Sequence, residues 1–242
     1  MQDAKVRLYV EHPLGPGQPV PLAGDQAHYL FNVMRLGPGA AVVLFNGRDG
    51  EWRAEVATVG KRGGGMICVA QTRPLQMPPD LWLLFAPIKK ARTDFIVEKA
   101  TEMGVARIVP VQTAHTNSER IRQDRLQAHA VEAAEQCGGT YVPAVTELMA
   151  LDRVLADWPR DRRILWCDEA LLGARAALLR DGVRGPWAVL IGPEGGFSEA
   201  ERGRLGAMPQ VVPASLGPRI LRADTAAVAA LTLWQAVLGD WA

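Results

Sequence analysis

Residues Ile191–Arg202 read IGPEGGFSEAER and directly follow the apolar run Trp187–Leu190. A short apolar run, a glycine-rich loop and a helix start are typical of nucleotide-binding α/β proteins. Ser198 and Glu201 have the spacing of a capping box, which predicts that a helix begins after the loop. The stretch therefore predicts a strand, a loop that approaches a ligand, and a helix, and it indicates an α/β fold.

The spacing within this loop argues against the two commonest phosphate-binding motifs. A P-loop needs a lysine and a hydroxyl residue after its last glycine, but no lysine follows here and Glu194 would repel phosphate. A dinucleotide fingerprint needs G-x-G-x-x-G, which Gly192, Gly195 and Gly196 do not match. The loop either brings backbone close to a ligand without a polyphosphate or is only a tight turn.

Length and composition are those of an ordinary globular protein. The 242 residues allow one large domain or two smaller ones, and 48% of them are hydrophobic, enough for a sizeable core. The net charge of +1 provides no global basic field for nucleic acid. The three cysteines are far apart and the four histidines are scattered, which argues against disulfides and structural zinc. We therefore expect a cytoplasmic protein with no metal and no membrane segment.

The sequence pattern of residues 1–73 differs from that of the rest of the chain. They contain short apolar or alternating runs separated by Gly/Pro turns, which predict a small β-barrel or sandwich: VRLYV, AVVLF and EWRAEVATV. One helical piece around His28–Arg35 interrupts them. This part carries eight basic and six acidic residues. The three prolines of Arg73–Asp80 predict a linker, so the expected domains are 1–73 and 74–242.

After the linker, apolar runs alternate with helical patterns, which predicts a parallel sheet with helices on both faces. The expected strands are LWLLFAP, VARIVPV, RRILWC, WAVLI and QVVPA. The expected helices are ARTDFIVEKATEMG, one capped by Ser118 and ending at Cys137–Gly139, one around Ala170–Arg180, and one after Ser198. Ligands of such sheets bind at the carboxyl ends of the strands, where the GPEGG loop is expected.

The last helix, AAVAALTLWQAVLG, is expected from about Ala223 to Leu238. Only Thr232 and Gln235 are polar in this stretch. A helix that is apolar on every face is buried on every face, either in a core or in a subunit interface. The pattern favours a homodimer over burial in a monomer core.

A second loop, LGPRILRADTAA (Leu216–Ala227), follows the first. Taken alone, Asp224 or Thr225 caps a helix and Arg219 is a surface charge. Together with GPEGGFS, however, LGPRILRADTA closely resembles the carboxyl-terminal signature of the RsmE family of 16S ribosomal RNA (uracil-N3) methyltransferases. Three further stretches resemble the family's amino-terminal and central motifs: HYLFNVMRLGPGAAVVLFNG, DFIVEKATEMGVARIVPV and VEAAEQCGGTYVP.

This resemblance covers nearly the whole chain and implies a fold that composition does not reveal. Family members have a SPOUT-type carboxyl-terminal domain with a trefoil knot, here residues 74–242. Their amino-terminal domain, here residues 1–73, is a PUA-like β-barrel that helps to hold RNA. They bind S-adenosylmethionine in the knot and form homodimers through the terminal helix. Their substrate is a uridine in the decoding region of the small ribosomal subunit.

The resemblance also implies which residues contact the cofactor. Glycine allows backbone to approach a ligand closely because it has no side chain. The expected contacts are Cys167, Asp168 and Glu169 at a strand end, Ile191, Gly192, Gly195 and Gly196 in the first loop, and Leu216, Gly217, Ile220, Leu221, Arg222 and Thr225 in the second.

Methylation of uracil N3 requires an in-line approach to the methyl carbon and the loss of the N3 proton. Arg222 is the first catalytic candidate, because a fixed guanidinium binds the base carbonyls or the uracil anion. Its alternative role is a helix-end salt bridge with Asp224. Asp224 or Glu194 is the candidate general base, with a helix cap and a loop hydrogen-bond acceptor as their respective alternatives. No catalytic cysteine is needed.

Two positions depart from the family pattern. The family commonly has LRTETA where this chain has LRADTA, so Asp224 is one methylene shorter than the usual Glu. The shorter side chain weakens the case for Asp224 as a general base, if that role requires the reach of Glu. Arg222 alone would then suffice for catalysis. The family often has an arginine where Gly139 stands, so an RNA-backbone contact there is either lost or supplied by a neighbour.

Several basic residues are expected to position RNA phosphates, although each taken singly also fits a solvated surface. Lys89, Lys90 and Arg92 follow the first strand of the large domain, and the small domain carries Arg35, Arg53, Lys61 and Arg62. The N3 edge of uracil is buried in paired RNA, so the target uridine must be unpaired or flipped out.

Two other functions stay open. A related knotted enzyme would methylate a ribose 2′-hydroxyl or another base with similar cofactor loops, although the EAAEQCGG motif argues against it. A non-catalytic ribosome-assembly or RNA-binding factor would keep the knot without the reaction, although the intact GPEGG and LGPRILR loops argue against it. Calorimetric binding of S-adenosylmethionine would separate the second case from an enzyme.

Overall fold

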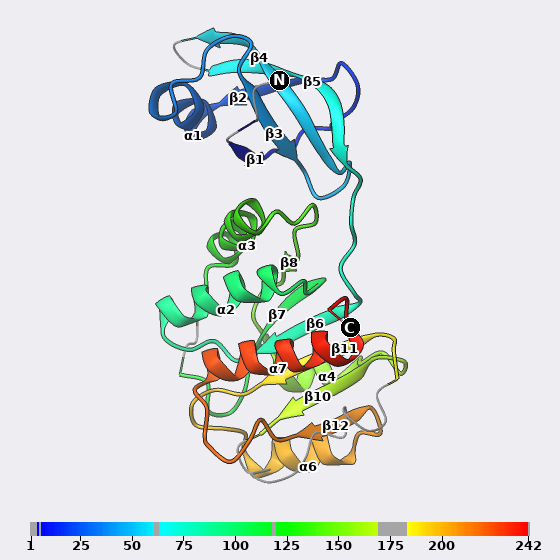
Figure 1. Cartoon of the computed structure of the whole chain (residues 1–242). Coiled ribbons are helices and arrows are strands. Elements are labelled where there is room, and N and C mark those ends of the chain that lie inside the picture. Colours follow the sequence, from blue (N-terminus) through cyan, green and yellow to red (C-terminus); the bar gives the residue numbers. More distant parts are fainter. Residues whose placement is uncertain (1–3, 5, 61–62, 118–119, 169–182, 242) are drawn as a thin grey trace. The chain divides into compact units, whose positions relative to one another are not determined.

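The computed structural model describes residues 4, 6–60, 63–117, 120–168 and 183–241 (Figure 1). They pack into two compact units. The first unit consists of Met1–Met77 with Ala134–Val142, and the second of Pro78–Ala133 with Pro143–Ala242. The first unit is thus discontinuous in sequence. The functional domain boundary expected at residue 73 stays a prediction.

The first unit contains a five-stranded sheet in the order β1-β3-β4-β5-β2. β1 pairs with β3 in parallel, and the other neighbours are antiparallel. The strands are β1 (Arg7–Tyr9), β2 (Pro19–Ala23), β3 (Ala41–Phe45), β4 (Glu51–Gly60) and β5 (Gly63–Arg73). The predicted β-rich amino-terminal part is confirmed. The prediction missed β2 and β5, because the prolines of β2 and the three glycines that begin β5 are rare inside strands.

The helical piece of this unit is short and irregular. α1 (Gly24–Ala27) continues into the π-helical η1 (His28–Val33), which buries Leu30 in the core of the sheet. Arg35 follows with a φ of 53°, a left-handed conformation that is uncommon outside glycine. The helix predicted around residues 28–35 is therefore confirmed over His28–Val33.

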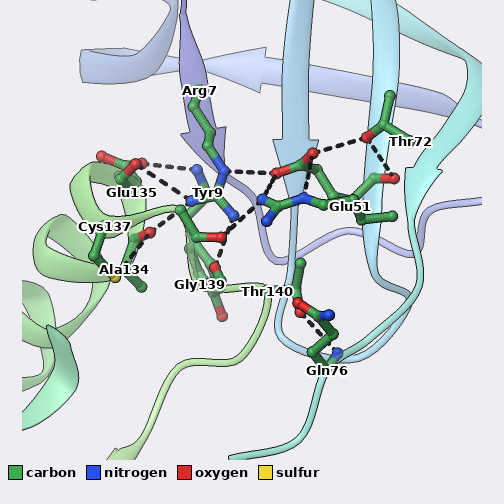
Figure 2. Close-up of polar contacts among 12 residues, drawn as sticks. Arg7, Tyr9, Glu51, Thr72, Gln76, Ala134, Glu135, Cys137, Gly139 and Thr140 are labelled. Atoms are coloured by element: carbon green, nitrogen blue, oxygen red, sulfur yellow. Dashed lines mark hydrogen bonds and ion pairs between the residues drawn. The ribbon is translucent and has the colours of Figure 1, made fainter. Parts of the chain in front are cut away.

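A buried carboxylate organises one end of the first unit. Glu51 begins β4, its side chain is only 8% exposed, and it forms ion pairs with Arg7 and Arg73 (Figure 2). Thr72 also donates a hydrogen bond to Glu51 Oε1 at 2.8 Å. Burial works to raise the pKa of Glu51, but the hydrogen bonds from Arg73, Arg7 and Thr72 outweigh it and lower that pKa to about 2. The carboxylate therefore stays charged at neutral pH.

The same two arginines hold the carboxyl end of α3 (Gln123–Cys137). Arg7 donates to the carbonyl oxygens of Ala134 at 2.6 Å and Gly139 at 2.7 Å. Arg73 donates to the carbonyl oxygen of Gly138 at 2.7 Å. The last carbonyls of a helix lack partners within the helix and carry partial negative charge, so two guanidinium groups stabilise this end. The EQCGG stretch thus has a structural role in the first unit.

The second unit contains a parallel sheet in the order β12-β10-β11-β6-β7-β8, and β9 pairs with β7 beside this path. Its strands are β6 (Leu81–Phe85), β7 (Arg107–Gln112), β8 (Ala144–Val145), β9 (Met149–Ala150), β10 (Arg163–Cys167), β11 (Trp187–Ile191) and β12 (Val211–Ala214). All pairs are parallel, so the carboxyl ends of the strands meet at one edge. The predicted parallel α/β sheet is confirmed, whereas the trefoil knot stays a prediction.

Helices cover both faces of this sheet. α2 (Lys90–Glu102) and α7 (Ala223–Leu238) pack side by side, and α7 lies against β11 (Figure 1). α4 (Leu151–Ala156) and α6 (Glu199–Ala207) contribute Leu155 and Leu205 to a separate core cluster. No helix within the described ranges is long and apolar enough to cross a bilayer.

Several predicted helix boundaries can be compared with the structure. The capping box before α6 is confirmed: Ser198 Oγ accepts the backbone N–H of Glu201, and Glu201 accepts the backbone N–H of Ser198 at 2.8 Å. α3 begins at Gln123, later than predicted, and Ser118 lies outside the described residues. The helix predicted around 170–180 also lies outside them.

α7 is only partly enclosed by its own chain. Its buried side includes Leu231, Trp234 and Gln235, and Gln235 donates to the carbonyl oxygen of Met103 at 2.6 Å. Thr232 and Ala236 are exposed on the other side. The core of one chain therefore does not bury the helix all round.

Candidate active site

A pocket of about 270 Å³ lies at the carboxyl edge of the parallel sheet. The ends of β10, β11 and β12, the loops after β11 and β12, and the start of α7 form it. It is lined by Cys167, Asp168, Ile191, Gly192, Pro193, Glu194, Gly195, Ala214, Ser215, Leu216, Gly217, Arg219, Ile220, Leu221, Ala223 and Ala226. These segments meet because adjacent parallel strands end at the same edge, where such sheets bind ligands.

Most residues expected to contact the cofactor line this pocket: Cys167, Asp168, Ile191, Gly192, Gly195, Leu216, Gly217, Ile220 and Leu221. Gly196, Arg222 and Thr225 adjoin lining residues without lining the pocket themselves. Glu169 lies outside the described residues. The cofactor contacts themselves stay predictions.

The end of β10 presents a buried charge to the pocket. The Asp168 side chain is 1% exposed, and Arg202 of α6 donates to its two oxygens at 2.7 and 3.1 Å. Such a two-pronged pair lets a carboxylate stay ionised where water is scarce. Burial raises the pKa of the neighbouring Cys167 thiol to about 12, so this thiol stays protonated at neutral pH and is not a nucleophile.

The first loop, Gly192–Gly196, turns tightly from β11 towards α6. Gly196 donates its N–H to the carbonyl oxygen of Pro193 at 2.9 Å and has a φ of 66°, which favours glycine. A Cβ on Gly192 would lie 2.8 Å from the ring of Phe197. Gly192 is therefore required by the packing of Phe197, whether or not a ligand approaches it.

A residue that the sequence did not single out braces this loop. His115, in the segment after β7, has Nδ1 at 2.9 Å from the carbonyl oxygen of Gly195 and 3.2 Å from that of Gly196. Carbonyls only accept, so Nδ1 carries the proton in this contact. The adjacent Ala114 N–H donates to Glu201 at 2.8 Å. The segment after β7 thus holds the first pocket loop and the start of α6 in place.

The second loop depends on Gly217. Its φ is 114°, a conformation that side-chain-bearing residues rarely adopt, and a Cβ there would meet nothing within 4 Å. Backbone conformation, and not space, therefore requires glycine at this position. Ile220 further along the loop is 74% exposed although it is large and apolar. The loop presents an apolar side chain beside the pocket, where a bound ligand could cover it.

We predict that Gly217→Ala raises the Kd for S-adenosylmethionine about tenfold, because forcing this backbone conformation costs about 1–3 kcal/mol. Calorimetric titration measures the Kd. Gly203→Ala in α6 is the matched control: it adds the same methyl group into open space and has no positive φ. A Gly217→Ala variant that binds as tightly as Gly203→Ala would contradict the prediction.

The three catalytic candidates lie close together in the chain's fold but differ in their partners. Glu194 forms an ion pair with Arg92 at 2.6 Å, and Asp224 lies 3.7 Å from the same arginine. Arg222 precedes α7 as its N-cap residue and is exposed. No ion pair joins Arg222 and Asp224 in the described part of the chain. The helix-end salt bridge given above as the alternative role of Arg222 is therefore not present there.

The residues expected to position RNA also differ in their contacts. Lys89 and Lys90 are exposed at the start of α2 and make no ion pair with any described residue. Arg35 is exposed as well, whereas Arg53 forms a surface ion pair with Glu55 at 2.8 Å. Arg92 is already paired with two carboxylates. Lys61 and Arg62 lie outside the described residues, and the RNA contacts stay predictions.

Sequence reasoning missed the contacts that join distant segments. His115 lies 80 residues from Gly195, and Arg92 lies 102 residues from Glu194. Neither pair has a local spacing that could reveal it, because only the order of strands in the sheet brings them together. No group of three or more metal-binding side chains occurs within the described ranges.

Two family models match this chain. One, described as an RNA methyltransferase domain, matches residues 76–235, which is more than half of the chain. The other, described as an RNA methyltransferase PUA domain, matches residues 22–63. The two models follow one another along the chain as the β-rich part and the parallel sheet do.

Named relatives match over nearly their full lengths. The Rickettsia conorii protein "Ribosomal RNA small subunit methyltransferase E" is 28% identical over 232 residues, which is 93% of each chain. The Bacillus subtilis protein of the same name is 27% identical over 224 residues, 87% of each chain. A crystal structure of such a methyltransferase from Neisseria gonorrhoeae, bound to S-adenosyl methionine, superposes with a TM-score of 0.88 at 27% identity, covering 98% of this chain and 99% of that one.

Proposed function

The chain belongs to the family of RNA methyltransferases that includes Ribosomal RNA small subunit methyltransferase E, and on this basis we propose that it methylates N3 of a uridine in the decoding region of 16S ribosomal RNA. S-adenosylmethionine is the cofactor. The pocket formed by the GPEGG and LGPRIL loops is the observation that carries the proposal. The trefoil knot expected for this family is part of the same proposal.

The residues of the pocket suit S-adenosylmethionine. Its aliphatic lining, including Ile191, Leu216 and Leu221, fits the apolar faces of an adenine. The lining contains no lysine, and its charged side chains are Arg219 and the carboxylates of Asp168 and Glu194, each of which is paired with an arginine. Such a lining, without a cluster of basic groups, suits a ligand without phosphates better than a nucleotide polyphosphate. When bound, S-adenosylmethionine supplies a methyl group carried on a sulfonium cation.

The protein's own groups would then orient the uracil and manage its N3 proton. Arg222, exposed between the pocket-lining Leu221 and Ala223, can bind the uracil carbonyls and stabilise the negative charge that develops as the proton leaves. A carboxylate oxygen of Asp224 or Glu194 can accept that proton. Lys89 and Lys90, which are exposed and form no ion pair with a described residue, can hold the RNA backbone.

The test uses small ribosomal subunits from cells that lack this protein. They are incubated with the purified protein and S-adenosylmethionine, and the methylated nucleosides are mapped by mass spectrometry. The proposal expects one new N3-methyluridine in the decoding region. A methyl group on a ribose or another base would retain the cofactor site and reject the substrate. S-adenosylmethionine binding with no methyl transfer would favour a non-catalytic assembly factor.

The proposal includes a homodimer formed through α7. The incompletely covered side of this helix carries Val228, Leu233 and Val237, all half-buried, and a second copy would cover these aliphatic side chains. Sedimentation equilibrium should give about twice the chain mass, and Leu233→Glu should shift the protein towards monomer. A monomeric wild type would reject this part of the proposal.

The proposal also places the protein in the cytoplasm, because three free cysteines fit a reducing compartment.

A further inference from the structure

Arg92 lies at the start of α2, where hydrogen bonds fix the backbone. The neighbouring Thr93 is buried, and its hydroxyl both accepts the N–H of Ile88 and donates to the carbonyl oxygen of Ile88, each at 3.0 Å. These bonds fix the first turn of α2 to the segment that follows β6. The Arg92 side chain, 29% exposed, therefore extends from a well-defined backbone.

The guanidinium of Arg92 reaches the loop after β11 and the first turn of α7, which follows the second loop. Its Nη1 donates to Glu194 Oε1 at 2.6 Å, and its Nε lies 3.7 Å from Asp224 Oδ2. Glu194 belongs to the loop after β11, and Asp224 follows the loop after β12. A planar guanidinium has donors in several directions, so one arginine can engage two carboxylates where a lysine serves as a single point charge.

Arg92 is also the cation that keeps these two carboxylates together. No other described residue forms an ion pair with Glu194 or Asp224. Among the described residues, Asp224 Oδ1 accepts only the N–H of Thr225, at 2.9 Å, within its own helix turn. Without the guanidinium, the two negative charges would repel each other, and the first loop and the start of α7 would separate.

We propose that Arg92 is a positioning residue for methyl transfer, which ties the first cofactor loop to the start of α7, where the second loop ends, through Glu194 and Asp224. This role rests on the proposed function of the pocket. It differs from the phosphate contact that sequence reasoning assigns to Arg92, because the charge of the side chain is already matched by carboxylates. The adjacent Lys89 and Lys90 keep their charges free for RNA.

The first test measures hydrogen exchange without any cofactor or RNA. In Arg92→Ala, amides of residues 192–197 and 215–225 should exchange up to about fivefold faster than in the wild type, because the ion pairs that hold the two segments together are lost. Lys90→Ala removes an equal charge two residues before Arg92 and should leave the exchange rates of both segments unchanged. Equal exchange of the two loops in both variants would overturn the proposal.

The second test separates loop positioning from RNA contact. In Arg92→Ala, the Kd for S-adenosylmethionine should rise about tenfold, and Arg92→Lys should recover only part of that loss. Combining Arg92→Ala with Glu194→Gln should give less than the sum of the single effects, since the pair is already broken. The outcome against the proposal has two parts. The Kd for S-adenosylmethionine stays unchanged, and the slope of RNA affinity against salt concentration falls by the amount expected for one lost phosphate contact. Arg92 would then be an RNA contact instead.

The two tests also keep the failure of this inference distinct from that of the proposed function. If the wild type does not bind S-adenosylmethionine, the proposed function falls. The exchange experiment still decides the role of Arg92, because it needs no ligand.

Discussion

Replacing Arg222 with alanine is expected to lower the rate of methyl transfer by about 10²- to 10³-fold, the usual effect of removing one fixed donor from developing negative charge. Arg222 is exposed and makes no ion pair or side-chain hydrogen bond with any described residue, so its charge remains available for a substrate. The start of α7 adds its partial positive charge at the same place. Single-turnover rates on ribosomal subunits would measure the loss.

Because Arg222 is exposed and forms no ion pair with a described residue, the variant should fold normally and bind S-adenosylmethionine within about twofold of the wild type. Arg160→Ala is a suitable control, since Arg160 is also exposed but lies before β10, at the opposite edge of the sheet. Arg222→Lys should recover part of the rate, because it restores charge without the planar fork. A rate for Arg222→Ala equal to that of Arg160→Ala would remove Arg222 from the mechanism.

Replacing Glu51 with alanine should destabilise the first unit by about 3 kcal/mol, because it leaves two arginines beside helix carbonyls without their counter-charge. The expected loss lies at the lower end for buried pairs, since the Arg73 side chain is 40% exposed. Glu55→Ala, on the same strand, breaks only a surface pair with Arg53 and should cost less than about 1 kcal/mol. Hydrogen exchange of the amides of β3 to β5 in increasing urea would measure both.

The effect of Glu51 should also depend on pH. Its pKa is lowered from 4.5 to about 2 in the folded protein, so the folded state binds this proton less readily than the unfolded state. The stabilisation is therefore fully present above the unfolded pKa of 4.5 and is lost as the pH falls towards 2. The wild type and Glu51→Ala should converge in stability over that interval. A difference that stays constant with pH would show that packing, and not charge, causes it.

Sequence patterns gave a good account of the regular elements in this protein. Apolar runs such as Trp187–Ile191 become buried parallel strands, and Ser198 and Glu201 form the predicted capping box. The patterns failed where regular periodicity breaks. β2 and β5 contain the prolines and glycines that normally mark turns, and α3 starts later than its polar approach suggests.

The site was predictable in its loops but not in its supports. Gly192 directly follows β11 and Gly217 comes shortly after β12, so sequence order placed both at the carboxyl edge where the pocket lies. Arg92 of α2 and His115 of the segment after β7 contact the first of these loops, and no local spacing records either contact. Arg92 was instead read as a surface charge for RNA, because a sequence reveals the presence of a cation but not the carboxylates that will surround it.

The discontinuity of the first unit has a consequence for the order in which the protein can mature. Arg7 and Arg73 bind carbonyls of residues 134–139, so the nascent amino-terminal unit emerges before its last component exists. Synthesis of the 65 residues from Pro78 to Val142 takes roughly 3–13 s at 5–20 residues per second. During that delay Arg7 and Arg73 have Glu51 as their counter-charge but lack the helix carbonyls that they also bind. Completion of this unit is thereby tied to translation of the other, and neither is finished as an independent module.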